Sequence, residues 1–357
     1  MSFKCGVVGL PNVGKSTLFN ALTASNAAEI ANYPFCTIEP NSGTIVVPDY
    51  RIEQLAKIAG SAIKKPTKIE IFDIAGLVAG AHKGEGLGNL FLGYIREVDA
   101  IIHVVRCFDD SNITHVANKV DPLFDIGVVN LELIMADLAS LEKRLPVLEK
   151  KVKRDPGMIK MLEAAKGALN VLHQEKMACE ALVPYDDLQL LQLITTKPVL
   201  YVCNVDEQSI VNGNSYSDIV CKQSPNAVLV SAAMEAALSE MSAEEQSEFF
   251  FSEGLGGSSL SGLIRAAYDL LGLITFFTVG PKEARAWTLK KGSFAPQAAG
   301  IIHTDMEKGF IKAETISYND YIKHAGELAC KEAGKSRQEG KDYIVADGDI
   351  FNFKFNI

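Results

Sequence analysis

The chain has 357 residues, of which 48% are hydrophobic and 22% are charged, and it carries a formal net charge of −9 at pH 7. This length and composition are ordinary for a packed globular protein of two or three domains. No run of about 18 apolar residues is present, so we expect no membrane span, and the acidic charge argues against general binding of DNA. The seven cysteines form no C-x-x-C pair, so neither a zinc site nor a disulfide framework is predicted.

Short β-branched runs, each bounded by polar or turn residues, alternate with helical patterns along much of the chain. The runs lie at 3–9, 68–74, 100–105, 198–202 and 227–230. The first is followed by a helical pattern over 14–24. Strands that alternate with helices predict a mainly parallel sheet covered on both faces. The predicted fold class is therefore α/β, with a doubly wound sheet in a domain formed by residues 1–127 and 182–275.

Residues 128–181 follow a different pattern. Apolar residues are spaced alternately three and four apart, which is a heptad seam. They are Leu131, Ile134, Leu138, Leu141, Leu145, Leu148 and Val152. A turn signal at 154–157 separates them from a second seam of Met158, Met161, Ala165, Ala168 and Leu172. This predicts an antiparallel helical hairpin that protrudes from the sheet domain, with its first helix kinked at Pro146.

The last part of the chain, residues 276–357, predicts a small α+β domain. Short alternating segments lie at 275–279, 285–289 and 343–345, and a helix is expected over about 318–333. Near the end, Asp347-Gly348 precedes an alternating segment, which is a β-hairpin signal.

A phosphate-binding motif occupies residues 9–17, which match G-x-x-x-x-G-K-[ST]. A predicted strand precedes the motif and a predicted helix follows it, as a P-loop NTPase requires. Backbone N–H groups must converge on the phosphates, so side chains must be absent at Gly9 and Gly14. We expect Lys15 to reach the β- and γ-phosphates and Ser16 to bind Mg²⁺. The other residues predicted to contact nucleotide here are Asn12, Val13 and Thr17.

Two further segments suit the γ-phosphate and the metal. Asp73 stands at the end of a predicted strand, where a carboxylate can hold Mg²⁺ through water, and the Gly76 N–H can sense the γ-phosphate. Thr37 lies between this segment and the P-loop, and its hydroxyl and carbonyl can close over Mg²⁺ and the γ-phosphate. The predicted metal ligands are therefore Ser16, Thr37 and Asp73.

The predicted base site follows the strand at 198–202. Asn204-Val205-Asp206-Glu207 stands where guanine-binding proteins have N-K-x-D, whose Asp accepts two hydrogen bonds from guanine. Glu207 is one methylene longer, so this two-point fit is lost and ATP is favoured over GTP. Ser231 and Ala232 follow the next strand, where a second base-contacting loop is expected.

The water-orienting group is left open by the sequence. Leu77 follows Gly76, where many P-loop switches carry Gln, and Leu cannot orient water. His82 and His115 are candidates for this role, although each is also compatible with an ordinary structural or solvated histidine. Asn12 is a candidate ligand for K⁺ against the phosphates.

Basic residues gather near the predicted hairpin tip. They are Lys143, Arg144, Lys150, Lys151, Lys153 and Arg154. A solvated helix face and a contact with RNA phosphates are both compatible with them.

These motifs resemble the YchF family of Obg-like ATPases over essentially the whole chain. The matching segments read GLPNVGKST at 9–17, ANYPFCTIEPN at 31–41, DIAGLVAGAHKGEGLGN at 73–89, NVDE at 204–207, AGIIHTDMEKGFIKAE at 299–314 and EGKDYIVADGDIFNFKFN at 339–356. The resemblance implies a ribosome-associated ATPase in which Val205 contacts the base. It also implies that His115 lies on a mobile loop as a catalytic histidine, and that the C-terminal domain is a β-grasp TGS domain.

The resulting functional hypothesis is an ATP-hydrolysing switch that binds the ribosome, both rRNA and ribosomal proteins, through the hairpin and the TGS domain. Lys15, Gly76 and His115 are its predicted catalytic residues. A metabolic kinase and a non-hydrolysing nucleotide-binding module are the alternatives. The N-terminal apolar segment is too short for a signal peptide, so a cytoplasmic monomer is expected.

Overall fold

The computed structural model describes residues 3–30, 42–74, 87–116 and 119–356. The chain divides into two compact units. One comprises residues 3–43 and 70–263, and the other comprises 1–2, 44–69 and 264–357. Among the described residues, no helix is long and apolar enough to cross a membrane.

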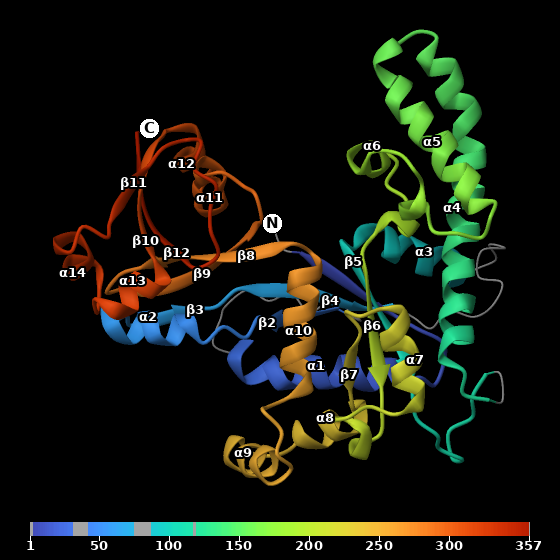
Figure 1. Ribbon diagram of the computed structural model, residues 1–357, viewed down its shortest axis with the longest axis horizontal. Helices are drawn as coiled ribbons and strands as arrows, with labels where there is room; N and C mark the ends of the chain where they lie inside the picture. The colour runs from blue at the N-terminus through green and yellow to red at the C-terminus, as the bar shows by residue number, and fades with distance from the viewer. Residues whose placement is uncertain (1–2, 31–41, 75–86, 117–118, 357) are drawn as a thin grey trace. The chain divides into compact units, whose positions relative to one another are not determined.

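A first sheet has six strands in the order β2-β4-β1-β5-β6-β7 (Figure 1). Their bounds are β1 Lys4–Val8, β2 Ser42–Val46, β4 Lys68–Asp73, β5 Ala100–Arg106, β6 Val199–Asn204 and β7 Val228–Val230. The pairs from β4 to β7 are all parallel. Every residue of β5 is buried, as expected for a central parallel strand covered on both faces. The predicted α/β class is confirmed.

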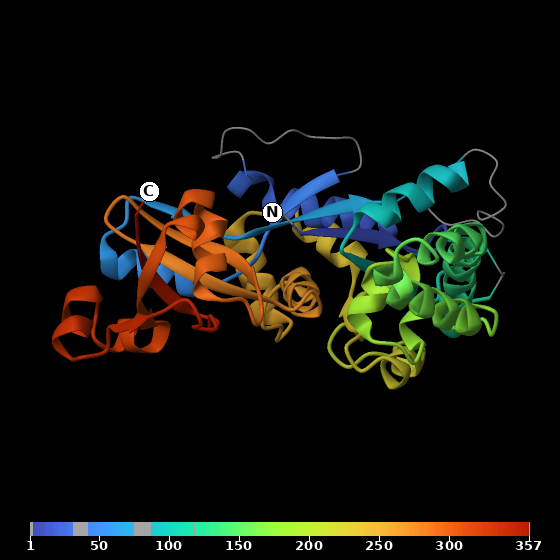
Figure 2. The ribbon, with the colours of Figure 1, turned by 90° about the horizontal axis from the view of Figure 1, so that it is seen from above.

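Helices lie on both sides of these strands (Figure 2). Those outside the hairpin are α1 Lys15–Ile30, α3 Leu87–Glu97, α7 Ser215–Gln223, α8 Ala232–Leu238, α9 Ala243–Ser252 and α10 Ser259–Leu270. The sequence pattern located α1 correctly but ended it six residues early, since the prediction stopped at 24.

The predicted helical hairpin is formed by α4, Pro122–Val152, and α5, Ile159–Leu172, which extend beyond the sheet (Figure 1). A 3₁₀ turn at Pro156–Met158 joins them, with Asp155 as its N-cap. Helix α4 continues through Pro146 as one helix of 31 residues, so the kink expected there does not end the helix. Proline removes a single backbone bond, and packing of Leu141 and Leu148 on either side keeps the helix together.

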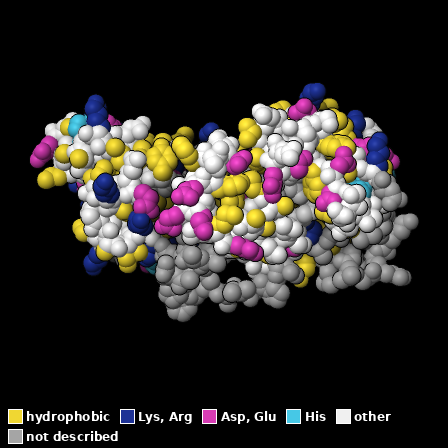
Figure 3. All heavy atoms as spheres, turned by 90° about the horizontal axis from the view of Figure 1, so that it is seen from below, with side chains coloured by type: hydrophobic (Ala, Val, Ile, Leu, Met, Phe, Trp, Pro, Cys, Tyr) yellow, Lys and Arg dark blue, Asp and Glu magenta, His cyan; other side chains and the backbone are white. Residues whose placement is uncertain are grey.

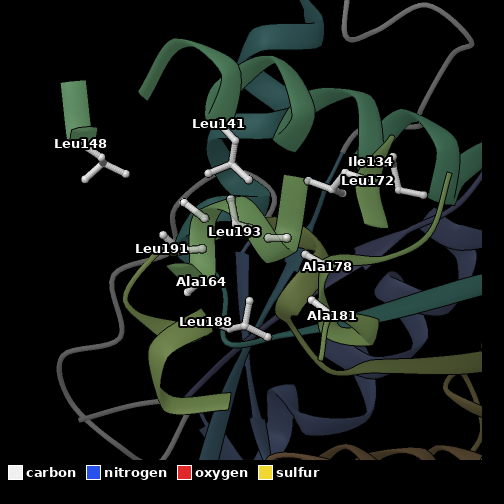
Figure 4. Close-up of a cluster of buried hydrophobic side chains, with 12 residues drawn as sticks. Ile134, Leu141, Leu148, Ala164, Leu172, Ala178, Ala181, Leu188, Leu191 and Leu193 are labelled. Atoms are coloured by element: carbon white, nitrogen blue, oxygen red, sulfur yellow. The ribbon is translucent and has the colours of Figure 1, made fainter. Parts of the chain in front are cut away.

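The hairpin has its own hydrophobic core at its base (Figure 4). Segment 178–193, which includes the 3₁₀ helix Ala178–Glu180 and α6, Tyr185–Gln189, closes this core. Its buried residues are Ile134, Leu141, Leu148, Ala164, Ala165, Ala168, Leu172, Ala178, Ala181, Leu188, Leu191 and Leu193. Most of the two predicted seams meet here, whereas Leu131 is 38% exposed and lies outside it.

Polar bonds fasten α4 to the chain that leads into β6. The buried carboxylate of Asp137 accepts from the amides of Ile194 (3.1 Å) and Thr195 (2.8 Å) and from the Thr195 hydroxyl (2.7 Å). These residues form the 3₁₀ helix Ile194–Thr196 immediately before β6. The hairpin base is therefore bonded to the strand that ends at Asn204.

The second unit contains another six-stranded sheet, in the order β11-β10-β12-β8-β9-β3. Its elements are α2 Arg51–Ala59, β3 Ile63–Lys65, β8 Leu273–Val279, β9 Glu283–Lys290, α11 Ala295–Ile302, α12 Thr304–Lys308, β10 Phe310–Ser317, α13 Tyr318–Lys323, α14 Glu327–Glu332, β11 Arg337–Glu339 and β12 Asp349–Phe355. Strand β3 pairs in parallel with β9, and α2 packs on the same hydrophobic cluster as Phe277 and Ile350. Residues 51–65, which form α2 and β3, thus pack with the C-terminal residues, whereas the sequence pattern had grouped them with the nucleotide-binding domain.

An arginine network fixes this segment. The Arg51 guanidinium lies 2.7 Å from Asp49 Oδ2 and 2.6 Å from Asp347 Oδ2, and the Thr275 amide donates to Asp347 Oδ1 (2.8 Å). Burial raises the pKa of the Asp347 carboxyl, but the bonds from Arg51 and Thr275 outweigh burial and lower it. The network holds the turn before β12 against α2.

Two local predictions in this unit are wrong. The helix expected over 318–333 is broken into α13 and α14, because Ala325 and Gly326 have positive φ angles of 56° and 130°. The Asp347-Gly348 turn does not close a hairpin, because β12 pairs with β10 and β8 instead. Asp347 is held by Arg51, and Gly348 has a φ of 89°, so the turn serves entry into a central strand.

Candidate functional site

The phosphate loop runs from the end of β1 to the start of α1. Gly9 and Gly14 have φ angles of 158° and 89°. A Cβ at Gly9 would lie 2.6 Å from the Val104 carbonyl oxygen, and one at Gly14 would lie 2.2 Å from Asn204 Nδ2. A side chain at either position would collide with these protein groups, so close packing of the loop against Val104 and Asn204 requires glycine here.

Lys15, Ser16 and Asp73 converge beside this loop. Lys15 is 8% exposed, and its Nζ lies 2.7 Å from Asp73 Oδ1. The Ser16 hydroxyl donates to Asp73 Oδ2 at 3.1 Å. A carboxylate and a hydroxyl are hard oxygen donors of the kind that Mg²⁺ prefers, so this pair fits the metal. The ammonium of Lys15 stands beside them, where it can turn to a phosphate.

Asn204 connects the phosphate loop to the loop after β7. Its Nδ2 donates to the Val13 carbonyl (2.8 Å), and its Oδ1 accepts from the Ala232 amide (3.0 Å). The side chain is 5% exposed. Both atoms of the amide are therefore used to hold two loops together. The sequence predicted Asn204 as a base contact, and this bridging role was not foreseen.

The neighbours of Asn204 lie in contrasting environments. Val205 is 2% exposed and packs in a cluster with Cys107 and Ile126, so its side chain faces the core. Glu207 is exposed and begins the 3₁₀ helix Glu207–Ser209. Ser231 Oγ is buried and has no hydrogen-bond partner among the described residues. Asp206 and Glu207 are thus the exposed side chains of this tetrad, and Asp206 caps the 3₁₀ helix by accepting from the Ser209 amide (2.9 Å).

His115 is buried against the first turn of α4. Its Nε2 lies 2.9 Å from Asp125 Oδ2, and the two side chains are 5% and 2% exposed. The preceding residue, Thr114, accepts through its carbonyl from Asn12 Nδ2 in the phosphate loop (3.1 Å). The segment that carries His115 therefore adjoins the phosphate loop, while the imidazole points into the protein.

Arg106 organises this segment and had no counterpart in the sequence analysis. The side chain is 1% exposed at the end of β5. It donates through Nε to the carbonyl of Phe108 (3.1 Å), through Nη1 to that of Ile113 (3.0 Å) and through Nη2 to that of Asp110 (3.1 Å). A buried arginine at a strand end is the signal that could have found it. Nothing in the spacing between His115 and Asp125 indicated their contact.

Several predicted residues lie outside the described part of the chain. They are Thr37, Gly76, Leu77 and His82. Of the others, Val13 is buried, and Asn12, Ser16 and Thr17 are exposed along the phosphate loop. Because Asn12 Nδ2 is bonded to Thr114, Oδ1 is the Asn12 atom suited to a cation.

Comparisons with known proteins match this architecture. A family model described as a 50S ribosome-binding GTPase matches residues 4–130. A YchF-GTPase C-terminal model, described as a protein of unknown function, matches residues 273–356. Among solved structures, the YchF GTPase of Schizosaccharomyces pombe is 37% identical with a TM-score of 0.84, covering 99% of this chain and 98% of its own. A GTP-binding protein from Pyrococcus horikoshii shares the fold, with a TM-score of 0.63 at 20% identity over 99% and 100% of the two chains.

Curated relatives are similar over the full length. The proteins from Haemophilus influenzae, Escherichia coli O157:H7 and Bacillus subtilis, each named ribosome-binding ATPase YchF, are 51%, 50% and 47% identical, with 100% of both chains covered in each comparison. The phosphate loop, the paired Ser16 and Asp73, and the two-unit fold are thus found in a chain whose sequence matches these relatives throughout. The chain belongs to the YchF family.

Proposed function

We propose that this protein hydrolyses ATP with Mg²⁺ and acts as a nucleotide-dependent switch on the ribosome. The observation that carries the proposal is the convergence of Lys15, Ser16 and Asp73 at the glycine-lined phosphate loop. Relatives with about half of their residues identical are named ribosome-binding ATPases, which supports both parts of the proposal.

The roles of the residues follow from their chemistry. Lys15 leaves Asp73 for the β- and γ-phosphates, and its charge stabilises the negative charge that shifts during phosphoryl transfer. Ser16 directly, and Asp73 through water, would hold Mg²⁺, which supplies charge neutralisation between the two phosphates when bound. Thr37 and Gly76 are proposed to complete the site on the γ-phosphate side, and Asn12 is proposed to hold K⁺. Segments 31–41 and 73–89 would relax after hydrolysis, as switch segments do.

The base preference rests on Glu207. The names of similar proteins differ between ATPase and GTPase, so names alone do not decide it. Glu207 is exposed next to the loop that Asn204 holds at Ala232, and its extra methylene removes the two-point carboxylate fit to guanine. Val205 and Ser231 are proposed to contact the base through their backbone, since both side chains are buried.

We expect ATP to bind more tightly than GTP, by about tenfold, because the carboxylate of Glu207 does not match both guanine donors. Calorimetry with both nucleotides and Mg²⁺ measures the two dissociation constants. The matched variant Glu207→Asp shortens the side chain and should improve the binding of GTP. The ratio of the dissociation constants for GTP and ATP should therefore become smaller. A wild-type preference for GTP would contradict this assignment.

The proposed ribosome contact is the basic tip of the hairpin. Lys150, Lys151 and Lys153 are exposed there, whereas Arg144 donates to the Leu191 carbonyl (2.8 Å) at the base. Helix α9 suits RNA poorly, because it carries exposed Glu residues, and acidic side chains gather in the middle of the view in Figure 3. Since rRNA is a polyanion, we assign its contact to the hairpin tip. The residues 276–357 are proposed as a TGS domain that supplies further contacts with rRNA and ribosomal proteins.

Reversal of Lys150, Lys151 and Lys153 to Glu should weaken co-sedimentation with ribosomes at least about tenfold, because three phosphate contacts are replaced by repulsion. A control with the same change in net charge reverses the exposed Lys119, Lys176 and Lys222, which lie outside both the tip and the C-terminal unit. Equal binding of both variants and the wild type would leave the tip lysines as an ordinary solvated face.

The alternative functions make different predictions. A kinase would need an acceptor, so release of free phosphate from ATP without one favours the switch. A binding module would release no phosphate from ATP, either alone or with ribosomes.

A further inference from the structure

The buried contact between His115 and Asp125 lies outside the phosphate-binding residues and joins two functional regions. His115 belongs to the segment that touches the phosphate loop through Thr114, and Asp125 belongs to the first turn of α4. We propose that Asp125 is a positioning residue that holds His115 in an inactive, buried position, so that this contact must open before hydrolysis. The inference rests on the proposed ATPase function and on a role for His115 in it.

The choice of ring nitrogen supports an inactive position. Nε2 is the distal nitrogen of the imidazole, the atom that reaches farthest from the backbone, and it is the one bonded to Asp125 (2.9 Å). The His115 side chain is 5% exposed. An attacking water therefore has no access to the nitrogen best placed to orient it. A histidine that orients water needs a ring nitrogen within hydrogen-bond reach of that water.

The segment that leads into His115 is held at several points. Arg106 donates to three carbonyls between Phe108 and Ile113, which fixes the path of the chain just before Thr114. Asn12 then holds the Thr114 carbonyl beside the phosphate loop. These restraints all precede His115, so the contact with Asp125 is a further restraint on the end of the segment, and its loss is expected to loosen the segment. The contact with Asp125 also contributes to the direction in which the ring points.

The Asp125 carboxylate is incompletely satisfied in this contact, so hydration of its unpartnered oxygen favours an opened state. Asp125 Oδ1 is buried and has no hydrogen-bond partner among the described residues. Burial raises the pKa of the Asp125 carboxyl, and the bond from His115 opposes this effect. A buried carboxylate with one oxygen unpartnered loses much of the stability that a fully bonded one has.

Asp125 links this contact to the hairpin. Asp121 caps α4 by accepting from the Phe124 amide (3.2 Å), Pro122 begins the helix, and Asp125 follows within the first turn. The same helix continues without a break to Val152 at the hairpin tip. A ligand that shifts α4 therefore acts on the bond that holds His115.

The test compares ATP hydrolysis by wild type, Asp125→Ala, His115→Ala and the double variant. We expect kcat of Asp125→Ala to rise about tenfold, because one charge-assisted hydrogen bond is removed from the inactive state. The ATP dissociation constant should stay unchanged, since Asp125 does not line the phosphate loop. His115→Ala should hydrolyse ATP more slowly than wild type, and the double variant should match His115→Ala.

Hydrogen–deuterium exchange gives a readout that does not depend on hydrolysis. Amides in 107–116 should exchange faster in Asp125→Ala than in wild type, while those in 126–141 keep their protection. Asp121→Ala is the control, because it weakens the same helical turn without touching His115 and should leave kcat unchanged. Should Asp125→Ala fail to fold, Asp125→Asn keeps the side-chain shape with a weaker bond, and a smaller rise in kcat is expected.

The outcomes separate the inference from the function. A kcat of Asp125→Ala equal to or below that of wild type would overturn the inactive-position assignment, as would unchanged exchange in 107–116. A double variant faster than His115→Ala would show that Asp125 acts by another route, and would overturn it as well. Absence of phosphate release from the wild type would instead refute the proposed ATPase function, while the exchange experiment would still report on the contact.

Discussion

Replacing Lys15 by alanine is expected to lower kcat/KM for ATP at least about a thousandfold, with loss of measurable nucleotide binding. Lys15 is 8% exposed and pairs with Asp73 at 2.7 Å, so its charge is held at the glycine-lined loop. Without it, no ammonium stands beside the phosphates, and the carboxylate of Asp73 repels them. Phosphate release and binding of a fluorescent ATP analogue measure the two effects.

The matched control for this variant is Lys64→Ala. Lys64 pairs with Glu53 on the surface, with side chains 47% and 61% exposed, so its removal changes the net charge equally and leaves the site intact. Thermal melts should show both variants folded. If Lys15→Ala retained more than about a tenth of wild-type kcat/KM, the assignment of Lys15 to the phosphates would fail.

Replacing His103 by phenylalanine is expected to make the protein more resistant to acid. His103 lies on the buried strand β5, 2% exposed, with its ring 5.4 Å from that of Tyr201. Burial lowers the pKa of the imidazole from its ordinary 6.5 to about 3, because a charge would be desolvated there. The unfolded chain binds this proton more readily than the folded protein. The stability that depends on neutral His103 is therefore complete above about pH 6.5 and is lost as the pH falls toward about 3.

The expected size follows from the same linkage. At about pH 4.5, protonation of His103 in the unfolded state lowers the free energy of unfolding of the wild type by about 3 kcal/mol relative to neutral pH. His103→Phe should not show this loss. Urea unfolding of wild type and His103→Phe at both pH values isolates the contribution of protonation. Any change in packing caused by the phenylalanine ring is the same at both pH values and cancels in the comparison. His173→Gln is the control, because the His173 side chain is 54% exposed. The pH dependence of its free energy of unfolding should equal that of the wild type. An equal pH dependence of wild type and His103→Phe would contradict the buried, neutral state of His103.

Much of the first sheet could be predicted because its signals are local. Each strand is a short apolar run, and the phosphate motif requires a strand before it and a helix after it. The hairpin was equally accessible, since the heptad spacing places Leu141, Leu148 and Ala168 on facing sides. Pro146 does not interrupt α4, because packing on both sides offsets the single missing backbone bond.

The placement of residues 51–65 could not be predicted from local pattern. Ile63–Lys65 is a three-residue strand with two charges, and its partner, β9, lies far along the chain. The bond from Arg51 to Asp347 is similarly remote. Such pairings depend on tertiary contacts that no spacing reveals.

In the candidate site, too, local features could be predicted from the sequence and tertiary contacts could not. Gly9, Gly14 and Lys15 follow from the demands of phosphate binding, which act within nine residues. The bridging role of Asn204 and the burial of His115 depend on loops brought together by the sheet. The residue types were found from the sequence, but the atoms that they bond could not be.

The unbroken course of α4 has a mechanical consequence. A helix of 31 residues is about 46 Å long and Asp137 lies halfway along it, so a tilt of about 5° about that residue displaces the two ends by about 2 Å in opposite directions. The three bonds that Asp137 receives from Ile194 and Thr195 act as a pivot part of the way along. A small rotation of α4 beside His115 therefore moves the hairpin tip and changes which groups the tip can contact. Conversely, a force applied to the tip rotates the first turn of α4 beside His115.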